Sequence, residues 1–138
     1  MFHKIHEIII EGIDKTGKDS LLPYLESLGN YYYVINVRGL LSQLAYNDLY
    51  HREYEYEIPD LSHILFVLLD ADDKDLDVRF KITNEPEINR RVNREAFYKA
   101  ASFLKNRYNA NILRINTSEV TPYQASLMIL DNIKQIEV

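Results

Sequence analysis

The sequence contains no cysteine in its 138 residues, which excludes a disulfide framework, a cysteine-ligated metal site and a cysteine nucleophile. It also lacks an apolar run long enough to cross a bilayer. The first residues do not form the apolar segment of a signal peptide, because Lys4, His6 and Glu7 interrupt it. We therefore expect a cytoplasmic protein with no membrane partner.

Positive charge is scarce as well, since 16 Lys and Arg stand against 21 Asp and Glu and give a net charge of −5. Non-specific nucleic-acid binding depends on a positive surface, so we do not expect a nucleic-acid partner. Residues 79–107 are an exception, with eight of the sixteen basic residues and only three acids. This segment suits a small polyanion, although each basic residue by itself is more simply explained by a solvated helix face.

The hydrophobic content of 46% and the charged content of 27% are typical of a single soluble globular domain. Its most informative stretch spans residues 8–20, where an isoleucine run meets Gly12 and Gly17-Lys18 precede a leucine-rich helical pattern. Glycines let the backbone curl so that successive N–H groups form an anion nest, and the following helix adds its positive end. The pattern indicates a strand, a phosphate-binding loop and a helix, with Lys18 reaching the terminal phosphates.

The match to the phosphate-loop pattern G-x-x-x-x-G-K-[ST] is imperfect, because Asp19 follows the lysine and the hydroxyl comes one residue later, at Ser20. The alternative is a glycine-bearing turn that binds nothing, and the strongly marked strand and helix on either side argue against it. We expect phosphate groups to be bound by Gly12, Thr16, Gly17, Lys18, Asp19 and Ser20.

Strands and helices alternate along the rest of the chain. Strands are predicted at 5–10, 31–37, 63–70 and 111–116, and helices at 18–28, 40–52, 73–82, 91–107 and from 122 onward, with connections at 53–60 and 83–87. This order predicts an α/β fold with a parallel sheet. The near-continuous apolar strands indicate a sheet covered on both faces, and hence a three-layer α/β/α domain with about four parallel strands.

With these segments placed, the chain resembles the thymidylate kinases and their relatives among the nucleoside and nucleoside-monophosphate kinases. Residues 11–18, EGIDKTGK, are similar to the family's E-G-x-D-[RK]-x-G-K phosphate loop. Residues 38–47, RGLLSQLAYN, resemble its D-R-x-x-x-S-x-x-A-Y-Q motif. Residues 67–72, with Leu76 and Arg79 after them, are similar to its last core strand and the start of its lid. The resemblance implies a single domain of the P-loop NTPase type over residues 1–138, with a lid-like segment at about 79–94.

The resemblance implies transfer of the γ-phosphate of ATP, with Mg²⁺, to a nucleotide or nucleoside, and deoxythymidine monophosphate is the favoured acceptor. Lys18 and the loop amides would hold the β- and γ-phosphates. Lys15 would lie over the transferring phosphate, and Arg79 would be a lid arginine that closes over the phosphates. Phosphoryl transfer needs positioning and neutralised charge more than covalent chemistry, and these residue types suit it.

The resemblance also assigns an acceptor site. Asp14 would contact the acceptor near its sugar or phosphate, and Arg38 would grip its phosphate. Ser42, Tyr46 and Asn47 would line the base pocket, with Asn47 in place of a base-reading glutamine. An amide offers a base edge both a donor and an acceptor.

The tyrosines at 46, 50 and 54 lie four residues apart, and they either stack on a base or pack as an aromatic edge.

The departures from the family pattern leave alternatives open. The acid that precedes the family's arginine is Val37 here. Asp19 either binds Mg²⁺, together with Ser20 and Asp70, or repels the nucleotide. The alternatives to a nucleotide kinase are a non-catalytic nucleotide-binding protein derived from one and a kinase acting on modified bases or ends in DNA. The family also implies a homodimer, for which helix 40–52 is a candidate face, and the compact size suits a small, phage-like genome.

Overall fold

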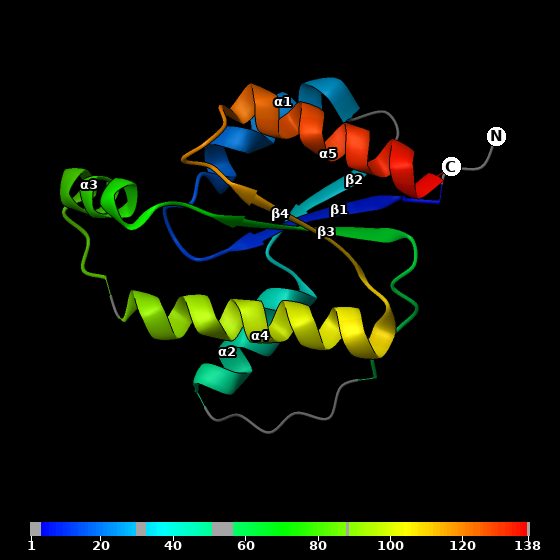
Figure 1. The fold of residues 1–138 in the computed structure, drawn as a ribbon, viewed down its shortest axis with the longest axis horizontal. Coiled ribbons are helices and arrows are strands. Elements are labelled where there is room, and N and C mark those ends of the chain that lie inside the picture. The colour runs from blue at the N-terminus through cyan, green and yellow to red at the C-terminus, as the bar shows by residue number, and fades with distance from the viewer. Residues whose placement is uncertain (1–3, 30–32, 51–56, 88, 138) are drawn as a thin grey trace.

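The computed structural model describes residues 4–29, 33–50, 57–87 and 89–137. Strands and helices alternate through most of the chain, and Figure 1 shows their arrangement. The strands are β1 (Glu7–Gly12), β2 (Val34–Val37), β3 (Ile64–Asp70) and β4 (Asn111–Asn116). The helices are α1 (Lys18–Gly29), α2 (Leu40–Leu49), α3 (Asp73–Thr83), α4 (Arg90–Tyr108) and α5 (Pro122–Glu137).

The strands form one parallel sheet in the order β2-β1-β3-β4. β1 and β3 lie in the centre and are buried along nearly their whole length, as their continuous apolar runs predict. Ile8 of β1 pairs with Ile35 of β2 on one side and with Leu65 of β3 on the other. The four-stranded α/β prediction is confirmed.

Helices cover both faces of the sheet and complete the expected three layers (Figure 1). On one face, Leu21 and Leu25 of α1 and Ile129 of α5 pack against the inward side chains of the strands. On the other face, Leu41 of α2 and Phe97 of α4 belong to a second apolar cluster. α3 projects beyond the end of the sheet, next to the carboxyl end of β3 (Figure 1).

Most predicted boundaries hold within a few residues, and β4 coincides with the predicted strand at 111–116. β1 differs, because it continues past residue 10 and pairs Glu11 and Gly12 with β3. A charged residue fits this buried position because donors from α2 surround its carboxylate. β2 covers Val34–Val37 of the strand predicted at 31–37, and Tyr33 before it is described without strand structure.

Residues 30–32 and 51–56 lie outside the described part of the chain. The predictions that fall on them are the start of the second strand, the end of the helix at 40–52 and part of the connection at 53–60.

The apolar side of α2 packs against α4 of the same chain, where Leu41 and Ala45 are fully buried. The homodimer face expected on this helix therefore overlaps the chain's own core, and the homodimer stays a prediction. Within the described residues, none of the helices combines the length and the apolar composition needed to cross a bilayer.

Candidate functional site

The loop from β1 to α1 has the backbone that its glycines predict. The φ angles of Gly12 and Gly17 are +138° and +96°, and Lys15 between them is also left-handed at +65°. A Cβ on Gly12 would lie 2.4 Å from the carbonyl oxygen of Leu69. Only glycine lets the loop press this closely on β3.

Two threonine hydroxyls fix the loop from inside. Thr16 Oγ1 donates to the carbonyl of Ile13 at 2.8 Å. Thr117, which follows β4, donates its hydroxyl to the carbonyl of Thr16 at 2.7 Å and its N–H to the carbonyl of Asp70 at 2.8 Å. Thr117 therefore ties the loop to the end of the central strand β3.

Lys18 folds back over the loop at the first turn of α1. Its Nζ donates to the carbonyls of Gly12 and Ile13 at 2.8 and 2.7 Å, and the residue is 7% exposed. Burial lowers the pKa of this ammonium to about 8, and the nearby Arg38 guanidinium adds to the shift. The loop thus holds a buried cation whose charge is lost only slightly above neutral pH.

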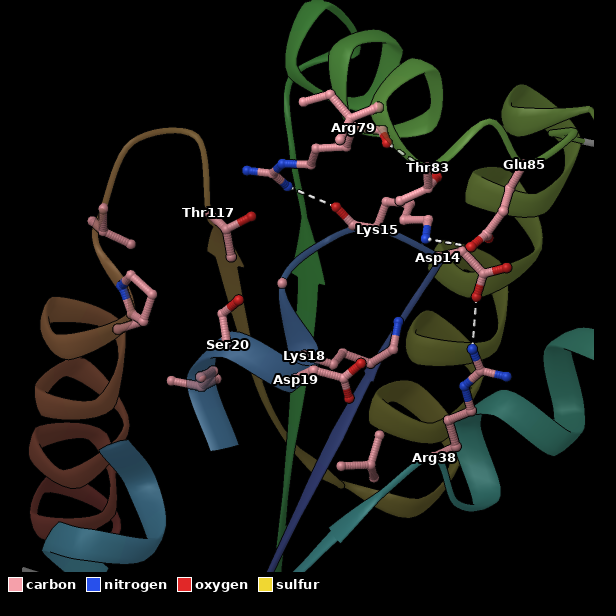
Figure 2. A pocket seen from close by; sticks show the side chains of 17 residues that line it. Asp14, Lys15, Lys18, Asp19, Ser20, Arg38, Arg79, Thr83, Glu85 and Thr117 are labelled. Atoms are coloured by element: carbon pink, nitrogen blue, oxygen red, sulfur yellow. Dashed lines mark hydrogen bonds and ion pairs between the residues drawn. The ribbon is translucent and has the colours of Figure 1, made fainter. Parts of the chain in front are cut away.

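A cavity of about 760 Å³ opens over the loop. Figure 2 shows Lys18, Arg38 and Arg79 around it, contributed by three different segments. Its charged lining residues are Asp14, Lys15, Lys18, Asp19, Arg38, Arg79 and Glu85. Leu21 of α1 and the residues around the start of α5, Val120, Pro122 and Ala125, form an apolar part of the lining. We call this the first cavity; it has both cationic and apolar walls.

Arg38 reaches the first cavity from the corner between β2 and α2. Its Nη2 pairs with Asp14 Oδ1 at 2.6 Å, and about half of its side chain is exposed. Its backbone is left-handed at φ +62°, a conformation that costs energy for a residue other than glycine. Arg38 and Lys18 line the same cavity, which is the arrangement that a phosphate loop beside an acceptor site requires.

The α3 side of the loop is also tied down. Arg79 Nη1 donates to the carbonyl of Lys15 at 2.7 Å, and Lys15 Nζ pairs with Glu85 Oε1 at 3.0 Å (Figure 2). Both side chains thus lie at the loop, and the roles that the resemblance gives Lys15 and Arg79 at a transferring phosphate stay predictions. A lid movement of the segment at about 79–94 stays a prediction, and Ile88 within it is outside the described residues.

A second cavity, of about 630 Å³, adjoins the first, and Asp14 lines both. Its walls include the aromatic residues Tyr46, Tyr50 and Phe97. The ring of Tyr46 meets that of Phe97 edge to face, with centroids 5.8 Å apart, and stacks nearly parallel to that of Tyr50, with centroids 6.4 Å apart. These tyrosines therefore pack as an aromatic edge and also face the cavity. Burial raises the pKa of the Tyr46 phenol. Tyr54 lies outside the described residues.

Two of the predicted acceptor residues are not among the residues that line either of these cavities. Ser42 is 3% exposed, and its hydroxyl donates to Glu11 Oε1 at 2.6 Å. The amide nitrogen of Asn47 is buried without a hydrogen-bond partner among the described residues. From the predicted acceptor set, Tyr46 and Asp14 line the second cavity.

The three predicted metal ligands are not brought together. Asp19 and Ser20 are exposed in the first turn of α1 and line the first cavity. Asp70 lines a separate hollow, where its carboxylate accepts from Tyr98 Oη at 2.6 Å and pairs with Arg94 at 2.9 Å. No group of three or more Asp, Glu or His side chains suited to a metal occurs in the described part of the chain.

The basic segment at 79–107 is largely neutralised by ion pairs. Arg90 pairs with Asp77 at 2.8 Å and also with Glu87 and Asp73, and these contacts raise its pKa. Arg94 pairs with Asp70 and Asp73. These arginines connect α4 to α3 and β3. Arg79 of the same segment lines the first cavity.

With this geometry established, the chain can be compared with known proteins. No family model matches it, and no curated protein matches it. Its fold is similar to that of the YorR protein from Bacillus subtilis, solved in complex with phosphorylated GDP. The TM-score is 0.71 at 15% sequence identity, over 93% of this chain and 95% of that chain. At this identity the likeness establishes the fold, and it extends over nearly the whole of both chains.

Sequence reasoning missed two residues that shape the site, Thr117 and Glu11. Thr117 is more than a hundred positions from the loop carbonyl it holds, and no local motif marks it. Glu11 gave a clearer signal, because an acid directly after an isoleucine run on a buried strand requires partners.

Proposed function

We propose that this protein binds a nucleoside triphosphate, with ATP as the first choice, and transfers its terminal phosphoryl group to a nucleotide or nucleoside. The observation that carries the proposal is the meeting of two unlike cavities at Asp14. The first has the phosphate loop and several cations, and the second has aromatic walls. The nucleotide complex of the structurally similar YorR protein supports nucleotide binding on this fold.

In the first cavity, Lys18 and the N-terminus of α1 bind the phosphates of the donor. Lys15 and Arg79 lie over the loop and neutralise charge on the phosphoryl group in transfer. The apolar wall near Val120 and Ala125 packs against the base of the donor. The described side chains thus provide charge at one end of the donor and apolar contact at the other.

In the second cavity, the ring of the acceptor packs beside Tyr46 and Phe97, and its reactive oxygen lies near Asp14 and Arg38. That oxygen forms a bond to the γ-phosphorus while the bond to the β,γ-bridging oxygen breaks, and the nucleoside diphosphate leaves with the electron pair. Arg38 stabilises the negative charge that the two substrates bring together.

Asp19 and Ser20 suit the Mg²⁺ that accompanies ATP, because Mg²⁺ in such sites takes one or two carboxylates and completes its shell with phosphates and water. Both residues line the first cavity and both are exposed. When bound, Mg²⁺ would supply further neutralisation of the phosphate charge. Asp70 is engaged by Arg94 and Tyr98, so it is the weaker candidate.

Deoxythymidine monophosphate, or a related pyrimidine, is the acceptor to test first. The resemblance in residues 11–18 and 38–47 favours it, and the aromatic cavity suits a planar ring. Asn47, the expected base-reading residue, does not line that cavity. Purine acceptors therefore belong in the same test.

A nucleotide-binding protein without turnover is the second candidate. Val37 places an apolar side chain in the wall of the first cavity, where the related kinases carry a magnesium-associated acid. Such a protein would bind ATP and leave it intact.

The deciding experiment incubates the protein with ATP, Mg²⁺ and a panel of nucleosides and nucleoside monophosphates, and measures ADP. Acceptor-dependent ADP that is lost in Lys18→Ala, and kept in the exposed control Lys74→Ala, supports the kinase. ATP binding without ADP formation supports the second candidate. Short single-stranded DNA in the panel tests a kinase that acts on DNA. Absence of ATP binding would refute both proposals.

A further inference from the structure

Glu11 is a buried charged residue that the proposed chemistry does not use. It is 0% exposed and stands directly before the first loop glycine. Its Oε1 accepts from the Gly39 N–H at 2.8 Å and from the Ser42 hydroxyl at 2.6 Å, and its Oε2 accepts from the Ser42 N–H at 3.2 Å. Burying a carboxylate costs free energy, and this cost is offset only where several hydrogen-bond donors contact the group.

All three donors belong to the start of α2. The first N–H groups of a helix have no partner within the helix, and a side chain usually accepts from them. Gly39, at the cap position of α2, has no side chain that could do so. Glu11 takes that role from the neighbouring strand, and its negative charge also suits the positive end of the helix.

The corner that leads into α2 is thereby fixed to three consecutive residues of β1. A Cβ on Gly39 would lie 3.0 Å from Cγ2 of Ile9, so the backbone at Gly39 packs closely against the Ile9 side chain. The carbonyl of Ile10 accepts from the Arg38 N–H at 2.8 Å, and Glu11 binds the residues that follow. Arg38 lies in the middle of these contacts with its left-handed backbone.

We propose that Glu11 is a positioning residue of the phosphoryl-transfer site. It holds the corner between β2 and α2 so that the guanidinium of Arg38 reaches Asp14 and faces the first cavity. Glu11 lines neither cavity and acts on the ligand only through Arg38. The inference rests on the proposed function, because it assigns Arg38 to the substrates.

A double-mutant cycle tests this role. The variants are Glu11→Gln, Arg38→Ala and the double variant, and the measurement is calorimetric binding of deoxythymidine monophosphate in the presence of a non-hydrolysable ATP analogue and Mg²⁺; binding of the ATP analogue by itself is measured for Lys18→Ala. Glutamine keeps the size of Glu11 but turns an amide N–H₂ toward one of its donors. We expect each single variant to bind about tenfold more weakly, since a hydrogen bond to a charged group contributes roughly this much. The double variant should bind no more weakly than Arg38→Ala.

The matched control is Glu7→Gln on the same strand. Glu7 also reaches toward β2, where its carboxylate accepts from Asn36 at 2.7 Å, but it lies at the opposite end of β1 from the loop. We expect unchanged binding. If Glu11→Gln does not fold, as judged by thermal unfolding, Ser42→Ala replaces it in the cycle, because it removes the 2.6 Å donor and leaves the carboxylate.

The outcomes separate this inference from the function on which it rests. The positioning role is overturned if the losses of affinity in the two single variants multiply in the double variant. It is also overturned if Glu11→Gln binds with normal affinity while Arg38→Ala binds more weakly. If Arg38→Ala binds with normal affinity and Lys18→Ala no longer binds, the positioning role is overturned while the proposed nucleotide binding stands. Normal binding by Lys18→Ala refutes the proposed phosphate site itself.

Discussion

At the scale of single residues, the proposed nucleotide binding should depend on pH through Lys18. Its pKa of about 8 lies below the ordinary 10.5, so half of the ammonium is lost at about pH 8 and nearly all of it above about pH 9. Phosphates bind the ammonium form and are themselves already ionised there. We therefore expect the affinity for ATP to be nearly constant below about pH 7, to decline through pH 8, and to fall by up to about tenfold per pH unit above about pH 9.

The control is Lys18→Arg, because a guanidinium keeps its charge across this range. In calorimetric titrations from pH 7 to pH 10, the affinity for ATP should decline for the native protein and stay constant for the variant. An equal decline in both proteins would mean that another group controls binding.

The two loop glycines differ in what surrounds them, and this difference predicts unequal effects of alanine. A Cβ on Gly12 would meet the carbonyl oxygen of Leu69 at 2.4 Å, whereas one on Gly17 meets only Thr117, at an ordinary 3.8 Å. Both positions have positive φ angles. We expect Gly12→Ala to lower the free energy of unfolding by about 3 kcal/mol or more and Gly17→Ala by about 1–2 kcal/mol.

Denaturant unfolding of the two variants measures this difference. Equal losses would indicate that the loop can move away from β3 at little cost.

From the local motifs the sequence predicted that Lys18 and Arg38 share one site, whereas Ser42 and Asn47, also predicted from a motif, line neither the first nor the second cavity. Lys18 and Arg38 lie on the first cavity because the loop and the corner each follow a strand of one parallel sheet, and parallel strands end at the same edge. Asp70 also ends a strand, yet its carboxylate is held by Tyr98 and Arg94 of α4. Such partners depend on how distant elements pack, which residue spacing does not reveal.

At the scale of elements, α5 begins with a capping box formed by Thr121 and Gln124. Thr121 Oγ1 accepts from the Gln124 N–H at 3.1 Å, and Gln124 Oε1 accepts from the Thr121 N–H at 2.9 Å. We expect Gln124→Ala to lower the free energy of unfolding by about 1 kcal/mol. Gln135→Ala, an exposed position near the end of the same helix, should change it much less.

Chemical denaturation of both variants checks this expectation. If the two substitutions have the same effect, the box does not stabilise the helix and the loss reflects glutamine packing alone.

Element types were predictable because each strand or helix has a clear apolar period, whereas the joins between elements were not. β1 runs on to Gly12 because α2 supplies donors to Glu11. α3 and α4 are held together by Arg90, whose guanidinium pairs with Asp77 of α3 and with Glu87 in the connection between the two helices. In the sequence this arginine appears only as one member of a basic segment.

At the scale of the whole molecule, ligand binding should stabilise the entire fold, because the first cavity draws residues from α1, the β2–α2 corner, α3 and the α5 end. ATP with Mg²⁺ at about 100 times its Kd should raise the free energy of unfolding by about 2.7 kcal/mol. The measurement is the midpoint of thermal unfolding with increasing ATP.

Adenosine, which lacks phosphates, is the ligand control, and Lys18→Ala is the protein control. Neither should give the increase seen with ATP and the native chain. If adenosine raises the midpoint of thermal unfolding by the same amount, the base causes the stabilisation and the phosphates contribute nothing to it.

The contact between Gly12 and the carbonyl of Leu69, together with the hold of Thr117 on the carbonyl of Thr16, has a consequence during synthesis. The ribosome makes the loop early, but the surfaces that shape it emerge only after β3 and β4 have been made. A nascent chain released before residue 117 would therefore contain every residue of the phosphate motif, but its loop would not be held in the folded conformation. Nucleotide capture would then report that translation has passed β4.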